Sequence, residues 1–369
     1  MADVQAVTQQ TIDDLVASGR ETGIQVCAYL DGEPVVNVCS GTADPATGRL
    51  VEETTLFNSW STGKGLASTV VHVLAEQGLL DYDTLIAEYW PRFAAHGKHG
   101  ITLAHVLTHR AGVPQAPAGI TLADLADWEG MCARIADLRP LWEPGTATGY
   151  HALTFGYIVG ETVRRATGQS IAQVLHDRVG LPLHTADDLF FGVPADQLPR
   201  TARLQDGNWS TIVDSRPDDS PFFQAAPRTV QPGAALGNDP GYLTTDVPCA
   251  GTMTAAALAR MYAALVGEVD GVRLVSPERT DRIAAILTTD ADPVLGAPVP
   301  KGLGYFLGLP EMGPHPRAFG CKGSGGSIAY ADPDDRFSFA LTHNRMTAPP
   351  EDTAAHIAGQ IRTALGIGP

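Results

Sequence analysis

The chain has 369 residues, of which 44% are hydrophobic and 18% charged, and its 41 acidic side chains outnumber its 25 basic ones, which gives a formal charge of −16. This apolar fraction is enough for a buried core and excludes a disordered or fibrous chain, and the length allows two or three domains. The charge disfavours nucleic acid and anionic membranes as partners, because proteins bind both through clustered Lys and Arg.

Cysteine spacing and the start of the chain indicate a cellular compartment. The five cysteines (Cys27, Cys39, Cys132, Cys249 and Cys321) lack any C-x-x-C spacing, so reduced thiols are expected rather than a disulfide framework or a zinc site. The first residues carry no basic, apolar leader pattern, and no run of about 18 apolar residues occurs. We therefore expect a cytoplasmic protein with no membrane partner.

The first predicted elements are a helix and a hairpin. Residues 4–18 place apolar side chains at mixed three- and four-residue spacings, which predicts a short amphipathic helix that packs on a sheet. Residues 24–30 and 35–39 are β-rich and flank Asp31-Gly32. This pair is typical of a tight hairpin turn, whose two positions need positive φ. The sheet is expected to begin with antiparallel strands.

The middle of the chain changes to helical spacing. Residues 61–78 place apolar side chains on one face of a helix that we expect to end at Gly78, and another helix over 155–163 is expected to end at Gly168. Residues 61–180 are therefore predicted to be mostly helical. For residues 192–248, rich in Pro, Gly, Asp and Ser, we predict long surface loops, although such a region can hold strands that this pattern does not reveal.

The last third returns to strands. A helix is predicted over 255–266, followed by strands over 327–331 and 337–342 that flank the turn sequence Asp332-Pro333-Asp334-Asp335, and by a terminal helix over 354–365. The predicted order is therefore a β-hairpin, a long helical insert, a second β-hairpin and a helix.

The sequence Ser61-Thr62-Gly63-Lys64 is the sharpest chemical signal. A serine and a lysine three residues apart on a helix share a face, so the lysine amine is within reach of the serine hydroxyl. Burial and the positive end of a helix dipole would both favour a neutral lysine, which can take the serine proton. The backbone N–H of Ser61 would face a developing oxyanion. The alternative is a helix-capping serine beside a solvated lysine.

Two further segments carry candidate site residues. Tyr150 ends a Gly-rich loop just before a helix, and a hydroxyl that faced Lys64 would be drawn toward phenolate and could act as a base. The segment Gly320 to Ser327 leads into a strand, and its glycines would let the N–H of Ser324 hold a ligand carbonyl. The alternatives are an ordinary half-buried loop tyrosine and a flexible glycine loop.

The sequence resembles the superfamily of serine β-lactamases and penicillin-binding proteins, and within it the class C-like branch that includes family VIII carboxylesterases. Beyond Ser61-x-x-Lys64, the resemblance rests on Gly78-Leu79-Leu80-Asp81, Tyr89-Trp90-Pro91 and residues 101–113 (ITLAHVLTHRAGV), in that order, and it spans nearly the whole chain. It implies an α+β fold, an α/β sandwich whose antiparallel sheet is flanked by helices and carries a large, mostly helical inserted domain.

The resemblance also implies domain limits and roles. Residues 1–60 and 245–369 would form the sheet domain and residues 61–244 the inserted domain, with the active site at their interface. Ser61 would be the acylated nucleophile and Lys64 and Tyr150 the proton-transfer pair. The N–H groups of Ser61 and Ser324 would form the oxyanion hole.

The chain departs from the family pattern at two places. The family's Tyr-x-Asn motif is Tyr150-His151-Ala152 here, which lacks the amide that holds a β-lactam side chain. The third motif is Cys321-Lys322-Gly323, so either Cys321 takes its first position or Lys322 substitutes from the next one. We expect Ser324, Gly323, Lys322, Cys321 and His151 to be the oxyanion and substrate-binding residues.

Other chemistries are disfavoured by the sequence. His105 and His109 are four residues apart but lack an H-E-x-x-H motif, so no metal is expected. The segment Gly325 to Ala329 is not a true G-x-S-x-G elbow. No activating base accompanies Cys321 as a nucleophile, and no Gly-rich loop matches a nucleotide-binding motif, so no cofactor is expected.

The function predicted from these residues is a serine-dependent acyl-transfer enzyme. A carboxylesterase acting on a small-molecule ester through a Ser61 acyl-enzyme is favoured, with an ester or amide substrate and no cofactor. The alternative is a transacylase that passes the acyl group to the amine or alcohol of a second metabolite. A β-lactamase or DD-peptidase is less favoured, and a binding protein without activity is the alternative from another class.

Overall fold

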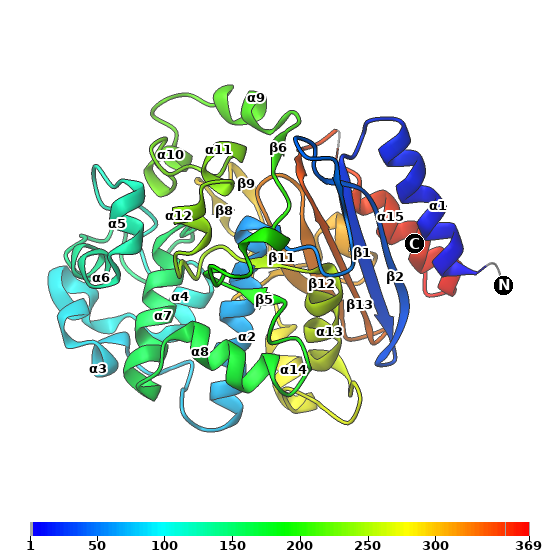
Figure 1. Cartoon of the computed structure of the whole chain (residues 1–369). Helices are drawn as coiled ribbons and strands as arrows, with labels where there is room; N and C mark the ends of the chain where they lie inside the picture. Colours follow the sequence, from blue (N-terminus) through cyan, green and yellow to red (C-terminus); the bar gives the residue numbers. More distant parts are fainter. Residues whose placement is uncertain (1–2, 351, 369) are drawn as a thin grey trace.

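A computed structural model describes residues 3–350 and 352–368. Within these residues, seven strands form one antiparallel sheet in the order β10-β11-β12-β13-β1-β2-β3, which joins the start of the chain to its last third (Figure 1). The strands are β1 (Gly23–Leu30), β2 (Glu33–Asp44), β3 (Arg49–Leu50), β10 (Phe306–Leu307), β11 (Phe319–Lys322), β12 (Ile328–Asp332) and β13 (Phe337–His343). The mixed helix and antiparallel-sheet fold expected from the resemblance is thus confirmed.

The central strands of the sheet are buried on both faces. Every residue of β13 is buried, and so is every residue of β1 except Leu30. Val26 lies opposite Leu341 on one side and Val38 on the other. The turn between β1 and β2 uses positive φ at Asp31 (52°) and Gly32 (84°), as its sequence predicts.

Helices cover each face of the sheet. The terminal helices α1 (Val4–Ala17) and α15 (Ala354–Leu365) pack on one face, where Ile12 and Ile357 share a core with Val26 and Phe339. Helix α13 (Ala255–Val266) contacts β1, β12 and β13 from the other face. Side chains of β1 alternate between these two cores, which is the pattern of a strand between two helical layers. Figure 1 shows α1 and α15 on one side of the sheet and α13 on the other.

Residues 61–180 are mostly helical, as predicted. The α-helix over the Ser-x-x-Lys segment begins two residues later than expected, at Gly63, after the 3-10 turn η1 (Trp60–Thr62), and α7 ends at Gly168 with φ 75°. The helices of this region are α2 (Gly63–Glu76), α3 (Ile86–Tyr89), α4 (Leu103–Leu107), α5 (Leu122–Ala126), α6 (Trp128–Ala136), α7 (Thr154–Thr167) and α8 (Ile171–Leu175), with the turns η2 (Pro91–Gly100) and η3 (His176–Gly180).

Residues 192–248 are more ordered than the predicted surface loops. They contain short helices and β6, which pairs in parallel with β14. Because each helix is only four to six residues long, no apolar periodicity accumulates to reveal it. The elements are η4 (Leu198–Arg200), β6 (Gln205–Asp206), α9 (Trp209–Asp214), α10 (Pro221–Ala225), α11 (Ala234–Gly237), α12 (Pro240–Leu243) and β14 (Arg345–Met346).

Short elements complete the chain around the sheet. Strands β4, β5 and β7 form a three-stranded sheet, of which β4 ends shortly before Ser61, and β8 pairs with β9. These elements are β4 (Phe57–Asn58), β5 (Leu189–Phe190), β7 (Thr252–Met253), α14 (Pro277–Ile283), β8 (Ala291–Asp292), β9 (Ala297–Pro298) and η5 (Pro310–Met312). The division into domains at residues 61 and 244 stays a prediction, and one large core cluster contains residues from both segments.

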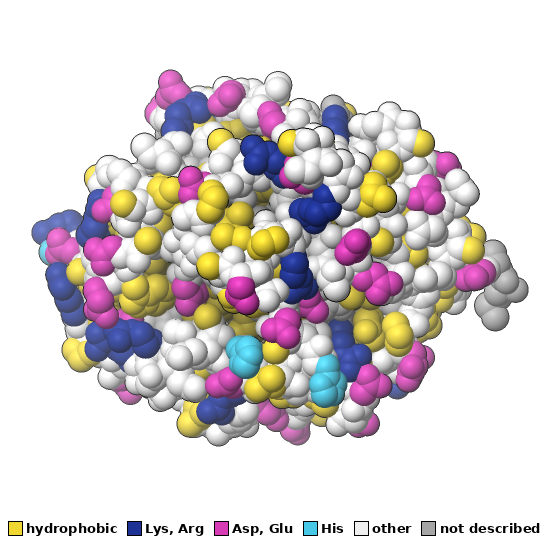
Figure 2. Space-filling view, viewed as in Figure 1, with side chains coloured by type: hydrophobic (Ala, Val, Ile, Leu, Met, Phe, Trp, Pro, Cys, Tyr) yellow, Lys and Arg dark blue, Asp and Glu magenta, His cyan; other side chains and the backbone are white. Residues whose placement is uncertain are grey.

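Charged side chains of both signs are mixed on the face of the molecule that Figure 2 shows. On this face, acidic side chains lie among Lys and Arg rather than in one patch. Among the described residues, no helix has the length and apolar character needed to cross a bilayer.

The central strand β13 should be sensitive to truncation. Phe339 is fully buried, and its ring centroid lies 5.6 Å from that of Tyr330. We expect Phe339→Ala to lower the free energy of unfolding by about 3–5 kcal/mol, because it removes apolar contacts and leaves a cavity. Urea denaturation would measure this. Leu50→Ala is the control: this side chain is 65% exposed, and its removal should change stability by about 0.5 kcal/mol or less. A similar loss in both variants would contradict the assigned core.

Candidate active site

Ser61 lies at a sharp turn between a strand and a buried helix. The strand β4 ends at Asn58, whose side-chain Oδ1 accepts the backbone N–H of Trp60 at 3.2 Å, and Trp60 has a φ of 48°. The helix α2 follows, and all its residues from Gly63 to Ala75 are buried. A Cβ at Gly63 would lie 2.2 Å from the carbonyl carbon of Ala250. This glycine therefore lets the start of α2 pack directly on the neighbouring backbone, while Ser61 itself stays half-buried.

The amine of Lys64 is buried and fully hydrogen-bonded. Its Nζ lies 3.2 Å from Ser61 Oγ, 2.9 Å from the Ala152 carbonyl oxygen and 3.0 Å from the Cys249 carbonyl oxygen. Three acceptors match the three N–H groups of an ammonium. A neutral amine would keep two N–H groups for the carbonyls and direct its lone pair at the Ser61 hydroxyl. The two carbonyls therefore aim the amine at the serine in both protonation states.

Tyr150 lies against the same amine. Lys64 Nζ is 4.8 Å from the centroid of the Tyr150 ring, which packs between His109 (centroids 4.8 Å apart) and Phe306 (5.8 Å). Burial raises the pKa of Tyr150, and the nearby Lys64 charge and the Ser61 hydroxyl offset this only in part. Tyr150 is therefore a neutral phenol at neutral pH, and not the phenolate toward which the sequence suggested it would be drawn. The cost of desolvating the phenolate outweighs its attraction to one cation.

The glycine loop after β11 is brought next to Ser61. Gly323 is packed so closely that a Cβ would lie 2.0 Å from the Ser59 carbonyl oxygen. Ser61 and Ser324 line the same two cavities. Among the described residues, no protein group accepts the backbone N–H of Ser324. The loop thus offers a free donor beside the serine, as an oxyanion hole requires.

Backbone geometry and a buried histidine hold this loop in place. Gly325 and Gly326 have φ values of 92° and 111°, which a residue with a side chain rarely adopts. The Gly325 carbonyl oxygen accepts the Thr347 N–H at 2.7 Å and lies 2.8 Å from His343 Nε2. His343 Nδ1 lies 2.9 Å from Glu21 Oε2. Although burial lowers the pKa of His343, Glu21 and the Gly325 carbonyl raise it by more.

Cys321 and Lys322, the two candidates for the first position of the third motif, have different surroundings. Cys321 lines the small cavity beside Ser61, Lys64 and Tyr150, and burial raises the pKa of its thiol to about 12, so the side chain is neutral. The Lys322 ammonium binds the carboxylates of Glu311 and Asp352. Cys321 thus lies next to Ser61, while the Lys322 ammonium is already paired with two carboxylates.

His151 is not brought to the cavity, contrary to its expected substrate-binding role. It is fully buried, with Nε2 accepting the Val113 N–H at 3.2 Å and Nδ1 lying 2.6 Å from the Gly149 carbonyl oxygen. Its backbone N–H donates to His109 Nδ1 at 3.1 Å. Both ring nitrogens of His151 and the Nδ1 of His109 thus contact backbone groups, which positions the Tyr150 loop, while His109 also lines the small cavity beside Ser61.

Besides the small cavity that Cys321 lines, two further hollows meet at Ser61. The larger, of about 220 Å³, is lined by Ser61 and Tyr150, by the glycine loop and by Trp209, Arg216 and Phe222. The other, of about 50 Å³, extends from Ser61 toward Leu153, Val230 and Tyr242. Sequence reasoning missed Trp209, Arg216 and Phe222, which fall in the segment predicted as surface loops. The carbonyls that bind Lys64 and the His343–Glu21 pair leave no signal in the sequence, since any residue type supplies a carbonyl and the pair is 322 residues apart.

The His343–Glu21 pair should make stability depend on pH. The pKa of His343 is raised in the folded protein. Its contribution is therefore fully present below the unfolded pKa, about 6.5, and is lost as pH rises through the folded value. We expect His343→Gln to lower the free energy of unfolding by about 1.5–3 kcal/mol near pH 6, and by less at higher pH. Urea denaturation at a series of pH values would measure the difference, and a difference that stays constant with pH would contradict a charged His343.

Comparison with known proteins agrees with this geometry. Residues 8–362 match the family model described as beta-lactamase. The esterase/beta-lactamase LipL of Mycobacterium tuberculosis is 36% identical over 89% of this chain and 78% of its own. A family VIII carboxylesterase of known structure has a TM-score of 0.88 and 33% identity over 98% of both chains. A penicillin-binding protein homologue from Caulobacter crescentus has a TM-score of 0.85 and 31% identity over 98% of this chain and 97% of its own. The chain therefore belongs to the beta-lactamase family and is an esterase/beta-lactamase-like serine hydrolase.

Proposed function

We propose that the protein is a carboxylesterase that acts through an acyl-enzyme on Ser61. The observation that carries this proposal is the contact between Lys64 Nζ and Ser61 Oγ, at 3.2 Å, beside Tyr150 and at the meeting point of two hollows. Whole-length similarity to a family VIII carboxylesterase supports an ester as the substrate.

In the first half of the reaction, Ser61 Oγ attacks the ester carbonyl carbon while Lys64 Nζ, which must be an amine for this step, takes the hydroxyl proton. The N–H groups of Ser61 and Ser324 stabilise the oxyanion. When the carbon–oxygen bond to the alcohol breaks, the proton passes from Lys64 to the leaving oxygen, either directly or through the Tyr150 hydroxyl. A phenol suits this relay, because it gives one proton as it receives another.

In the second half, water attacks the Ser61 ester and the same groups return the proton to Ser61 Oγ, which releases the acid. The two hollows suit this sequence, because one can hold the acyl group and the other the alcohol. The same arrangement can admit an amine or alcohol in place of water, so acyl transfer to a second metabolite is the alternative function.

Mass spectrometry of the intact protein tests the nucleophile and the base. Brief exposure to a p-nitrophenyl acyl ester should add one acyl group to the wild type and none to Ser61→Ala. Lys64→Ala should slow acylation by at least about 10²-fold, because no other group removes the serine proton. An adduct in Ser61→Ala, or unchanged turnover in Lys64→Ala, would refute the assigned roles. Faster loss of the adduct with an added amine or alcohol than in water would favour the transacylase.

The larger hollow is lined by the cation of Arg216, which favours esters that carry a negative charge. The Arg216 guanidinium stacks on Phe222, 4.7 Å from the ring centroid, and among the described residues no carboxylate pairs with it. The neighbouring acids Asp214 and Asp218 both bind Arg228 instead. Lys322, the other cation of this hollow, is paired with Glu311 and Asp352. Arg216 is therefore placed to receive a carboxylate carried by the substrate.

Removing this cation should weaken binding of anionic esters selectively. For Arg216→Gln we expect a five- to tenfold rise in KM for a p-nitrophenyl monoester of a dicarboxylic acid, equivalent to about 1–1.4 kcal/mol. The KM for a neutral p-nitrophenyl ester should stay within about twofold. Arg20→Gln, which removes an exposed arginine, is the control. Equal changes in KM for both esters would contradict a carboxylate-binding role for Arg216.

A further inference from the structure

A second cavity lies away from Ser61, in the helical region. It has a volume of about 380 Å³, within the range of small-molecule sites, and lies among α5, α6, α7, α8 and the segment 244–246. Ser61, Lys64 and Tyr150 do not line it, and the residues that do include Leu125, Trp128, Gly160, Arg164, Ser170 and Asp246. Leu125 also lines the hollow beside Ser61, so its side chain stands between the two spaces.

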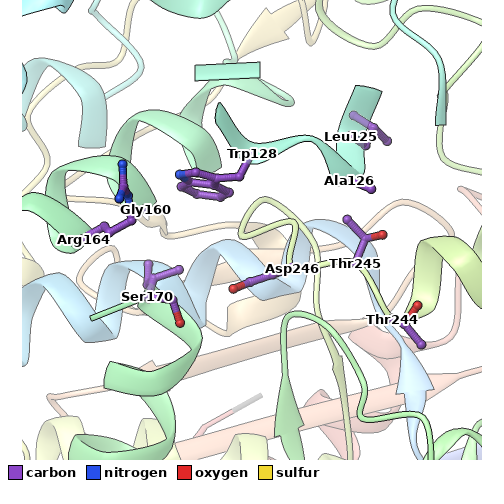
Figure 3. A pocket seen from close by; sticks show the side chains of 10 residues that line it. Leu125, Ala126, Trp128, Gly160, Arg164, Ser170, Thr244, Thr245 and Asp246 are labelled. Atoms are coloured by element: carbon purple, nitrogen blue, oxygen red, sulfur yellow. The ribbon is translucent and has the colours of Figure 1, made fainter. Parts of the chain in front are cut away.

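Asp246 extends its carboxyl group into this cavity. Figure 3 shows the side chain pointing away from its own backbone, into the space between Trp128 and Ser170. The carboxyl oxygen Oδ1 is inaccessible and has no hydrogen-bond partner among the described residues. Burial raises the pKa of this carboxyl to about 6, and no neighbouring cation lowers it. Asp246 as a whole is half-buried, and its shielded, unpartnered carboxylate oxygen is costly, so a donor from outside the chain that entered the cavity would relieve this cost.

The other polar groups around the cavity already have ion-pair or hydrogen-bond partners within the chain. Arg164 binds Glu161 at 2.8 Å and Glu129 at 3.1 Å, and Arg165 also binds Glu161. The hydroxyl of Thr245 donates to the Gly241 carbonyl oxygen at 2.6 Å. Ser170 Oγ accepts the N–H of Gln173 at 3.2 Å. The two arginines and two glutamates balance in charge, so ionised Asp246 leaves the cavity with one negative charge.

An aromatic wall is held rigidly on one side of this space. The indole N–H of Trp128 donates to Glu161 Oε2 at 2.9 Å, and its ring lies 5.2 Å from that of Tyr157. Gly160 makes room for the indole, because a Cβ there would lie 2.6 Å from Trp128 Cη2. With Leu125 and Ile171, this wall supplies the apolar surface of the cavity.

We propose that this cavity binds a small organic cation, a primary ammonium group carried on an apolar body. The ammonium would donate to the Asp246 carboxylate, and the body would lie against Trp128 and Leu125. Aromatic faces add to such binding, because they attract cations as well as apolar groups. The site is independent of acyl transfer at Ser61 and forms no covalent bond.

Binding should follow the ionisation of Asp246. The titratable and charged groups around this carboxyl are Tyr157 on α7, Tyr242 on α12, and the arginine–glutamate group Arg164, Arg165, Glu161 and Glu129. Burial holds the pKa of both phenols well above 10. Asp246 is therefore the group expected to change charge near pH 6. An ammonium favours its carboxylate form, so binding near that pH should release protons, and affinity should rise from pH 5 to pH 7.5.

Isothermal titration calorimetry with phenethylamine tests the site. The Ser61→Ala protein is used, so that no covalent chemistry intervenes. Saturable binding of one phenethylamine is expected. At pH 6 the measured enthalpy should differ between two buffers of different ionisation enthalpy, which reports proton release. Asp246→Asn, nearly identical in shape, should weaken binding at least tenfold, and Asp196→Asn, which alters an exposed carboxylate outside the cavity, should leave the affinity unchanged.

Several results would overturn the proposal. They are the absence of saturable binding, an affinity that Asp246→Asn leaves unchanged, and an enthalpy independent of the buffer at pH 6. Should Asp246→Asn fail to fold, Trp128→Leu takes its place and should weaken binding at least threefold, and unchanged binding there would equally overturn the proposal. The proton-release measurement needs no substitution in the cavity, so an enthalpy independent of the buffer would overturn the proposal even if neither variant folds.

Discussion

The site depends on how Lys64 is held. An amine buried to 3% exposure must have its hydrogen bonds satisfied, and here the acceptors come from three separate segments: Ser61 on the turn before α2, Ala152 after the Tyr150 loop, and Cys249 before β7. Each segment is fixed to the others through this one group. A shift of any of them would leave a buried donor or acceptor without a partner, which costs about 1–3 kcal/mol.

Glycines of the loop after β11 connect the turn that carries Ser61 to the central sheet. The close approach of Gly323 to Ser59 leaves no room for a side chain, so the end of β11 and the turn that carries Ser61 must move together. On the other side of the loop, His343 ties the Gly325 carbonyl to Glu21, which precedes β1. The Ser324 loop and the turn that carries Ser61 are therefore positioned by the central sheet and the buried helix rather than by a surface loop.

The features that were predicted correctly from the sequence depend on residues only a few positions apart in the chain. The Asp31-Gly32 turn, the strands on either side of it and the glycine end of α7 follow from residue types within a few positions. The proximity of Ser61 and Lys64 followed from helical spacing. The role expected for His151 failed because its neighbours Val113 and Gly149 meet it only after folding. Tyr150 was expected to be drawn toward phenolate, but desolvation, which no sequence pattern displays, has the larger effect on its pKa.

Helix α2 and the segment of residues 207–230 differ in how much sequence change they can tolerate during evolution. The helix is buried along nearly its whole length, so its amides should exchange with solvent only when the whole protein unfolds. The segment with Trp209, Arg216 and Phe222 consists of short helices joined by exposed turns, and such segments tolerate insertion and replacement. The wall that these three side chains form can thus be rebuilt without disturbing Ser61, Lys64 and Tyr150, so under the proposed function a change of substrate need not cost the protein its chemistry.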